Sequence, residues 1–366
     1  MRYLHILLRL PEAAVLVMAL LVPGQAAAQT PEPIVSSATL YVENDVVPHA
    51  GDNNDQNYTG GFGFHFQGRF ITALKLNSGV DLLDRLTGVS RAWDSAVPRY
   101  SFLLYGTGFT PDTLNEDDVI PDDRPYGSLV GIAIRKLTVE PAAQNSTWAS
   151  ELAVGMLGLR AAENIQGRLH AYLRKKNNSP TPYAPLGWSH QISDGGELTG
   201  LYRVSYDRLL LGDNADIARK HWQLVGGGEA MVGYYTNAAA VTSGRLGWFN
   251  SHYWEFTPGA MAIATQASLV PDVPRYELFL FGGLRGRLVG YNALLQGQFK
   301  NSDHTVTPER LIAETDFGLA ATVRVAKVNV QAVWNVGAGR TAEFKSTLAR
   351  RHTWGSLMFS ANWGMR

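Results

Sequence analysis

The chain contains no cysteine among its 366 residues. Disulfide bonds therefore cannot stabilise it, and the stability of the fold must come from a core or from a membrane. An excess of charge is missing as well, since 32 Lys and Arg residues balance 32 Asp and Glu residues. This balance argues against a nucleic-acid partner and gives no polybasic reason for docking on anionic lipid.

Long apolar runs are confined to the N-terminus. Arg2 and Arg9 precede the apolar segment 13–22, and the small residues 26–28 follow it. This is the pattern of a secretory signal peptide, so we predict a signal peptide at 1–28 and a single mature domain at 29–366. No later run approaches the roughly 18 apolar residues of a membrane-spanning helix, so the mature chain either is soluble or crosses a membrane as a closed barrel.

Two familiar catalytic motifs are also missing. The sequence has no Gly-x-Ser-x-Gly elbow, which would hold a serine nucleophile, and no His-Glu-x-x-His motif, which would bind zinc. A serine hydrolase and a zinc hydrolase of these familiar types are therefore disfavoured.

Alternation with a period of two residues runs through much of the remaining sequence. Phe62, Phe64 and Phe66 share one face of a segment whose other face is polar or small, and the pattern recurs in 311–322 and 356–363. Several such segments run to about ten residues or more, the length that a tilted strand needs to cross a membrane, whereas sandwich strands average about five or six. A high glycine count, 37, and an aromatic share of 10% also suit a sheet with tight turns and aromatic girdles.

The sequence therefore predicts an all-β fold, a transmembrane antiparallel β-barrel of about twelve strands. The predicted strands are 36–44, 58–67, 99–105, 125–138, 147–157, 198–210, 219–233, 238–248, 275–290, 309–324, 326–340 and 351–363. Two gaps, 68–98 and 249–274, are longer than tight periplasmic turns. The first contains five leucines, which predict either a short amphipathic helix at the inner rim or a disordered turn.

An even number of strands with both termini in the periplasm places every odd-to-even connection on the outer surface. These connections are 45–57, 106–124, 158–197, 234–237, 291–308 and 341–350. The third is the longest, and the spacing of its apolar residues predicts a helix over 161–176. Gln166 and His170 lie four residues apart on one side of that helix.

Four polar clusters fall in or beside these outer connections. They are 43–45, 57–60, 122–127, and the pair Gln166 and His170. Each has a plain structural alternative, because such residues also punctuate strand ends, form salt bridges at a rim or are simply solvated. Their coincidence at one rim favours a functional site, since loops held by a rigid scaffold are where sites are usually built.

The residue types suit hydrolysis by an activated water molecule. His170 could take a proton from water, because the unperturbed pKa of histidine lies near the working pH. Asn44 and Asp45 could offer hard oxygen ligands to Ca²⁺, which would stabilise a developing oxyanion. The segment 52–55 is a rival calcium site, but it lacks the Glu and the spacing of an EF-hand and is more typical of a polar hairpin loop.

Taken in order, these motifs resemble the LpxR-type outer-membrane lipid A 3'-O-deacylases. The resemblance rests on Glu43-Asn44-Asp45, Asn57-Tyr58-Thr59-Gly60, Asp123-Arg124-Pro125-Tyr126-Gly127, Gln166-x-x-x-His170 and Gly187-Trp188. It implies a twelve-stranded barrel that hydrolyses the ester holding the 3'-linked acyloxyacyl chain of lipid A.

The resemblance also implies roles for individual residues. His170 would be the catalytic base, Asn44 and Asp45 would belong to the calcium and oxyanion site, and Thr59 would place a hydroxyl group beside them. Supporting or substrate-binding roles fall to Gln166, Asp123 and Arg124.

Two other functions remain open at this stage: a non-catalytic porin or scaffold with the same fold, and a phospholipase on a similar barrel. A deacylase requires His170, Asn44, Asp45 and Thr59 to converge at one cleft, whereas a porin would scatter them around an open pore. We expect a monomer in the outer membrane of a Gram-negative cell that acts on lipid A or lipopolysaccharide.

Overall fold

The computed structural model describes residues 35–44, 47, 50, 57–89, 96, 98–177, 185–214, 217–256, 276–300 and 302–364. The predicted signal peptide, 1–28, lies outside the described residues, as do Asp45 and the segment 52–55. The helix that carries His170 is described, but the side chain of His170 is not.

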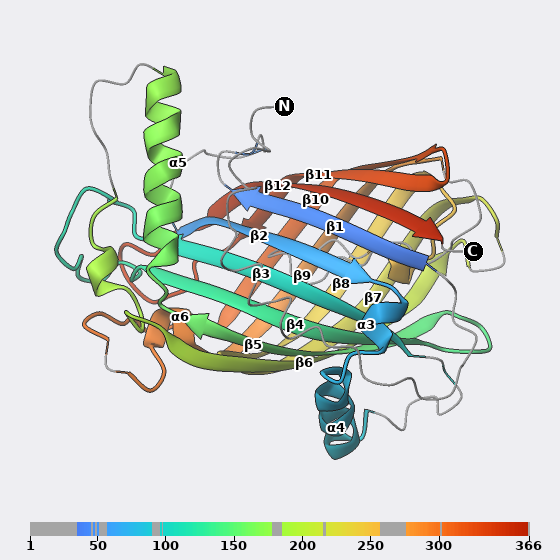
Figure 1. The fold of residues 1–366 in the computed structure, drawn as a ribbon, viewed down its shortest axis with the longest axis horizontal. Helices are drawn as coiled ribbons and strands as arrows, with labels where there is room; N and C mark the ends of the chain where they lie inside the picture. The colour runs from blue at the N-terminus through green and yellow to red at the C-terminus, as the bar shows by residue number, and fades with distance from the viewer. Residues whose placement is uncertain are drawn as a thin grey trace.

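Twelve strands close into one antiparallel barrel, in which each strand pairs with its neighbours in sequence and β1 pairs with β12 (Figure 1). The strands are β1 (Val35–Asn44), β2 (Asn57–Gln67), β3 (Arg99–Thr110), β4 (Gly127–Val139), β5 (Ser146–Leu157), β6 (Glu197–Gly212), β7 (Lys220–Gly233), β8 (Tyr235–Phe249), β9 (Glu277–Asn292), β10 (Leu311–Val325), β11 (Val328–Arg340) and β12 (His352–Gly364). The predicted fold is confirmed, and most strand ends differ from the prediction by one to three residues.

One strand end was predicted wrongly. The third strand was expected to stop at residue 105, but β3 continues to Thr110, and Gly106 and Gly108 pair with β4. In the barrel, the absence of a side chain at Gly106 makes room for the ring of Phe62, because a Cβ atom there would lie 2.6 Å from that ring.

The outer wall of the barrel is largely apolar, and many polar residues point inward. Along β10 the side chain of Leu311 is 69% exposed and that of Phe317 is 49% exposed, whereas Glu314 and Asp316 between them are buried. This inverted alternation is what a membrane-spanning barrel requires, since lipid contacts its outer wall and polar groups line its interior. No helix in the described part of the chain is long and apolar enough to span a membrane.

A network of buried ion pairs lies in the lumen. Glu314 contacts Arg285, Arg287 and Arg340 at 3.1, 3.1 and 2.6 Å. Glu229 on β7 contacts Arg203 at 2.6 Å and Arg287 at 2.9 Å, so the pairs join strands from β6 to β11.

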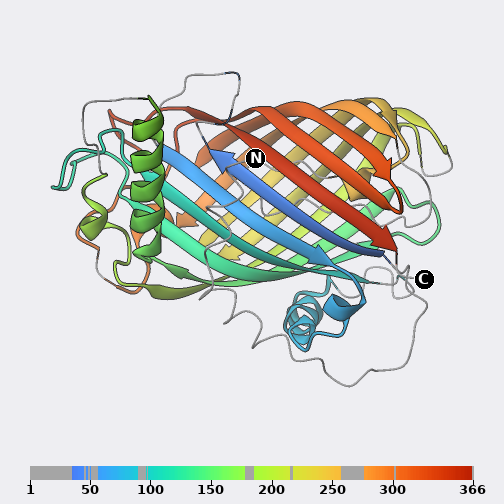
Figure 2. The same cartoon turned by 45° about the horizontal axis from the view of Figure 1, so that its top comes forward.

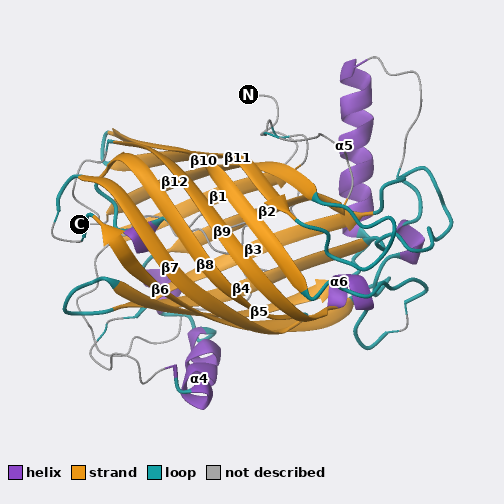
Figure 3. Ribbon diagram, turned by 180° about the vertical axis from the view of Figure 1, so that it is seen from behind, coloured by secondary structure: helices purple, strands orange, loops and turns teal. Residues whose placement is uncertain are grey.

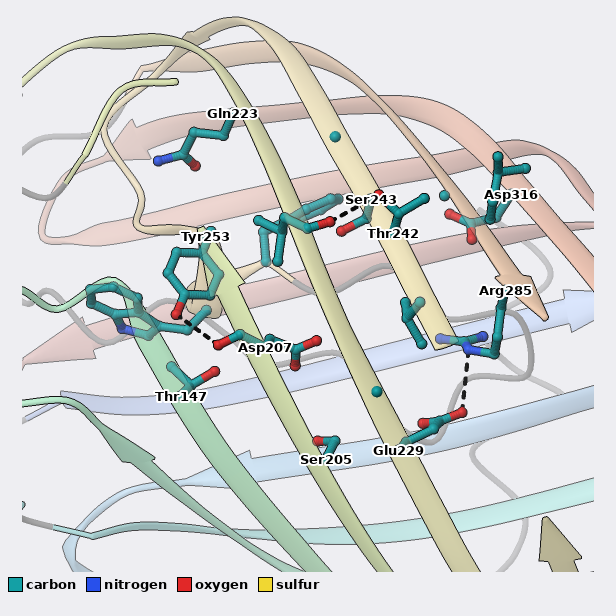
Figure 4. Close-up of a pocket in the computed structure, with 18 of the residues that line it drawn as sticks. Thr147, Ser205, Asp207, Gln223, Glu229, Thr242, Ser243, Tyr253, Arg285 and Asp316 are labelled. Carbon is teal, nitrogen blue, oxygen red and sulfur yellow. Dashed lines mark hydrogen bonds and ion pairs between the residues drawn. The ribbon is translucent and has the colours of Figure 1, made fainter. Parts of the chain in front are cut away.

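Small cavities remain above and below this network. Figure 4 shows the cavity of about 50 Å³ toward the end where β1 begins, with Arg285 and Glu229 meeting in its wall. A second cavity of about 80 Å³ lies toward the opposite end, and Arg203, Glu229 and Arg285 line both. The network therefore separates the two spaces.

Helices lie at both ends of the barrel (Figure 3). At the end where β1 begins and β12 ends, α3 (Arg69–Thr72) and α4 (Asn77–Thr87) form within the first long gap, which confirms the amphipathic helix rather than the disordered turn. At the opposite end, called the loop end below, α5 (Ala161–Asn177) and α6 (Ala293–Gln296) follow β5 and β9. The predicted helix in the third connection is thus confirmed. In the second gap the structure describes only a short 3₁₀ turn, η3 (Tyr253–Glu255).

Candidate functional site

The direction of the side chains near the end of β1 decides on which side of the barrel wall the site lies. Tyr41 and Glu43 line the cavity inside the barrel. Because successive side chains of a strand point to opposite faces, Asn44 points to the outer wall. The same alternation on β3, where Tyr105 and Phe109 line the cavity, puts Thr110 on the outer wall as well.

Asn44, Thr59 and Thr110 form a connected polar group on this outer wall at the loop end. The side-chain nitrogen of Asn44 donates a hydrogen bond to the backbone carbonyl oxygen of Thr59. The hydroxyl oxygen of Thr59 lies 2.8 Å from that of Thr110. The structure thus brings together Asn44 and Thr59, two of the four residues predicted to be catalytic, and adds Thr110.

A bulge in β2 makes this arrangement possible. The pairing of β2 with β3 shifts register between Tyr58 and Gly60, where Thr59 lies. A Cβ atom on Gly60 would lie 2.9 Å from the side-chain nitrogen of Asn44, so the glycine leaves room for the Asn44 amide. A substitution of Gly60 would therefore disturb the polar group directly.

Beneath the polar group, an aromatic cluster inside the barrel supports the wall. Tyr58 donates a hydrogen bond to Glu43, and its ring contacts those of Phe109 and Trp354 at centroid distances of 5.3 and 5.1 Å. The guanidinium of Arg124 lies 4.2 Å from the ring centre of Phe109. These rings fix β2 against β3 and β12 just inside the residues of the site.

Asp123 and Arg124 are buried in ion pairs at the mouth of the lumen. Asp123 accepts a hydrogen bond of 3.0 Å from Arg350, and Arg124 contacts Glu343 at 2.9 Å. Both pairs join the connection before β4 to the connection before β12. The geometry suits the supporting role that was expected for Asp123 and Arg124, because buried groups that are already paired are poorly placed to bind a lipid.

The positive charge around Glu343 keeps it ionised. Burial by itself would raise the pKa of this carboxyl group, but Arg340 and Arg124 beside it lower the pKa to about 2 from an ordinary value of 4.5. The mouth of the lumen is thus held together by charged groups at neutral pH.

Helix α5 is anchored to the barrel through its first half. The indole nitrogen of Trp188 donates a hydrogen bond of 2.9 Å to the side-chain oxygen of Gln166, and Gln166 is buried. The ring of Trp188 packs on that of Tyr126 at a centroid distance of 4.8 Å, with Leu114 beside them. The views agree that α5 stands across the loop end beside the ends of β2 and β3 (Figures 1 and 2). His170 lies one turn beyond Gln166 on this helix.

Several supporting residues were not found from the sequence. Thr110 was missed because its strand was predicted to end too early. Glu343 and Arg350 were missed because their partners are 219 and 227 residues away in the chain, and no local pattern marks such a pair. Trp188 was noticed in a motif, but its bond to Gln166 depends on the fold.

The described residues contain no group of three or more His, Cys, Asp or Glu side chains that could hold a metal ion. Of the two predicted calcium ligands, Asp45 lies outside the described residues. The hydrogen bond that Asn44 donates to Thr59 engages its side-chain nitrogen, whereas a hard cation would bind the amide oxygen.

Comparison with known proteins agrees with this architecture. The model of the family described as outer membrane protein LpxR matches residues 13–363. The chain belongs to this LpxR family. The family is that of the lipid A 3'-O-deacylases, which are ester hydrolases, and membership assigns the chain to this enzyme class in the outer membrane.

Solved structures support the fold. LpxR from Salmonella typhimurium superimposes with a TM-score of 0.65 at 14% identity, and the alignment covers 90% of this chain and 100% of that chain. At this identity the likeness shows the fold alone. The β domain of the Bordetella autotransporter BrkA gives a TM-score of 0.42 at 9% identity, covering 90% of this chain and 99% of that one, and no argument rests on it. Among curated proteins no match was found.

Proposed function

We propose that this LpxR-family barrel hydrolyses the ester of the 3'-linked acyloxyacyl chain of lipid A on its outer wall. The observation that carries the proposal is the position of Asn44, Thr59 and Thr110, which are joined by hydrogen bonds on the outer side of the barrel wall at the loop end. A lipid in the outer leaflet meets a barrel on this side and at this height. A water-soluble substrate that enters the lumen would not reach this outer side of the wall.

In the proposed reaction, His170 acts as the general base. It takes a proton from a water molecule whose oxygen attacks the ester carbonyl carbon. The bond from that carbon to the sugar oxygen then breaks, which releases the acyloxyacyl group as a carboxylic acid. The protonated imidazole returns its proton to the sugar oxygen, so the second product carries a 3'-hydroxyl group.

The other residues orient these partners. Trp188 holds Gln166, and the helical spacing places His170 one turn beyond this anchor. Asn44 and Thr59 provide polar side-chain groups on the wall that the helix stands beside. Ca²⁺ held by oxygen atoms of Asn44 and Asp45 would supply positive charge to the oxyanion of the tetrahedral intermediate.

The lumen argues against a porin. The ion pairs of Glu229 and Glu314 join β6, β7, β9, β10 and β11, and the participating side chains are buried. A porin needs a continuous water-filled channel, whereas these pairs occupy the channel at mid-height.

The experiment that tests the function is mass spectrometry of lipid A from a Gram-negative host that expresses the chain. We expect the mass of the 3' acyloxyacyl group to be lost with the native chain and kept with His170→Ala. Release that persists in His170→Ala would remove His170 from the mechanism. If the native chain releases nothing from lipid A but hydrolyses phospholipids, the site is that of a phospholipase.

A matched control uses another histidine of the same connection. His190 is partly exposed and pairs with Asp303 at 3.1 Å, away from the Asn44 group. His190→Ala should therefore keep the activity. Folding of each variant is checked by the difference in gel mobility between heated and unheated samples.

A further inference from the structure

Helix α4 lies on the outside of the barrel wall. It contacts β4 and β5. On β4 the side chains of Arg135 and Leu137 line the interior cavity, so Ile134 and Lys136 point outward, and α3 and α4 pack on Ile134. The segment between β2 and β3 therefore does not close the barrel end as a plug. It folds back along the surface that faces lipid.

Four polar contacts hold α4 on this surface. Lys136 on β4 pairs with Asp81 at 2.8 Å and with Asp84 at 3.0 Å. The hydroxyl group of Tyr100 donates to Asp81 and that of Tyr202 donates to Asp84, each at 2.8 Å. Without α4, an uncompensated lysine would stand on the lipid-facing wall, which is destabilising in membrane barrels. The helix is thus an integral part of the wall.

The two tyrosines indicate the depth of the helix in the membrane. Tyrosine gathers at the boundary between hydrocarbon and water, where its ring is apolar and its hydroxyl group finds polar partners. Tyr100 and Tyr202 point outward from β3 and β6 and reach the two aspartates of α4. Figures 1 and 2 agree that α4 runs across the long axis of the barrel rather than along it, which places the helix parallel to the membrane plane.

The side of α4 that turns away from the wall has two different stripes. Leu82 and Leu86 lie one turn apart and are 55% and 74% exposed. Ser78 and Arg85 form a neighbouring polar stripe and are also exposed. A helix that lies in a membrane interface has this division, with leucines toward the acyl chains and charged groups toward the headgroups.

Two observations identify the occupant of the leucine stripe as lipid. The stripe belongs to a segment that packs on the apolar outer wall, an interface with lipid that every membrane barrel possesses. Lys75 and Arg85 are exposed and form no ion pair with any residue that the structure describes, and their charge is complementary to lipid phosphates.

We propose that α4 is an interfacial helix that inserts Leu82 and Leu86 into the periplasmic leaflet of the outer membrane. The leaflet at this end consists of phospholipid, so the helix is a second lipid contact, distinct from the site at the loop end. The helix fixes the depth of the barrel in the membrane from the periplasmic leaflet, whereas the substrate lies in the outer leaflet.

The absence of cysteine allows a direct test, because any introduced cysteine is unique. Leu86→Cys and Arg85→Cys, adjacent positions on the two stripes, are each labelled with an environment-sensitive fluorophore on the whole chain. Leu284→Cys, on the lipid-facing side of β9 and 59% exposed, serves as the reference for membrane contact. Each protein is folded into vesicles of phosphatidylethanolamine and phosphatidylglycerol.

Quenching is measured with two agents: phospholipids that carry a spin label near the headgroup, and aqueous iodide on both sides of the vesicle. We expect the lipid-borne quencher to act several-fold more strongly on the Leu86 label than on the Arg85 label, and iodide to show the reverse order. Equal access of iodide to both labels overturns the proposal. A Leu86 label shielded from both agents overturns it too, and shielding that disappears on dilution with lipid identifies a second copy of the chain as the occupant.

Discussion

The indole nitrogen of Trp188 donates a hydrogen bond of 2.9 Å to the side-chain oxygen of Gln166. This bond links the short turn η2 (Trp188–His190) to the buried side of α5, one helical turn before His170. A helix that stands out from the barrel needs such an anchor, because a base must be held within a fraction of an ångström to act on water.

Removal of this bond should reduce the deacylation of lipid A. Trp188→Phe keeps a ring against Tyr126 but removes the N–H donor, so we expect a loss of about 1 kcal/mol of positioning energy, or a rate reduced about five-fold. The rate of acyl release measures it. Trp148→Phe is the control, since Trp148 packs on Tyr206 in the strands away from α5. An unchanged rate in Trp188→Phe would show that the bond does not position the helix.

The ion pair of Arg124 and Glu343 should matter for stability. The two side chains are 1% and 3% exposed, so Glu343→Ala leaves the buried charge of Arg124 without this partner, whereas Arg340 keeps its pair with Glu314. We expect the free energy of unfolding in detergent to fall by about 3–5 kcal/mol. Asp303→Ala, which breaks the more exposed pair with His190, should cost less than about 1 kcal/mol. Similar losses in both variants would contradict this account of the lumen mouth.

The same carboxylate predicts how stability depends on pH. Arg340 and Arg124 lower the pKa of Glu343 to about 2 although burial opposes this, whereas the ordinary value is 4.5. A depressed pKa in the folded state means that the stabilisation is fully present above pH 4.5 and is lost as the pH falls toward 2. Urea unfolding across this range should show the decline. Glu343→Gln should decline less over the same range, and an equal decline would assign the effect to other groups.

Calcium removal should stop the reaction without unfolding the barrel. An excess of chelator is expected to abolish acyl release, and added Ca²⁺ should restore it, because the proposed oxyanion charge comes from the ion. Asp45→Asn removes one negative charge from the ligands and should raise the Ca²⁺ concentration needed for half-maximal activity. Full activity of the native chain in excess chelator would exclude a role for the ion.

The filled lumen predicts an absence of ion conductance. In a planar bilayer we expect no steady current from the native chain, since the pairs of Glu229 and Glu314 occupy the channel. A porin incorporated under the same conditions is the positive control. Stepwise openings of uniform size from the native chain would favour the porin alternative.

Much of the barrel could be predicted from the sequence, because alternate residues of a strand face two different environments and therefore differ in polarity. The alternation of Leu311, Phe317 and their apolar neighbours with Glu314 and Asp316 identified both faces of β10 without any knowledge of its neighbours. The even number of strands then assigned each connection to the outer or the periplasmic end of the barrel. The end of β3 was the main exception, because this strand continues beyond residue 105 to Thr110 in the structure.

The candidate site was predicted less completely. Asn44 and Thr59 were named from their motifs, and the structure joins them by a hydrogen bond. That they lie on the outer side of the wall rather than in the lumen depends on the bulge in β2 and on the direction in which β1 ends. Neither feature follows from a motif of three or four residues.

The sequence by itself determined the class of fold, the number of strands and the end of the barrel at which Asn44 and Thr59 lie, since these depend on periodicity along the chain. Only the tertiary structure decided which charges meet. With 32 basic and 32 acidic side chains, no local rule pairs Arg124 with Glu343 or Lys136 with Asp84. Closure of the barrel brings such residues together, and burial then makes their pairing strong.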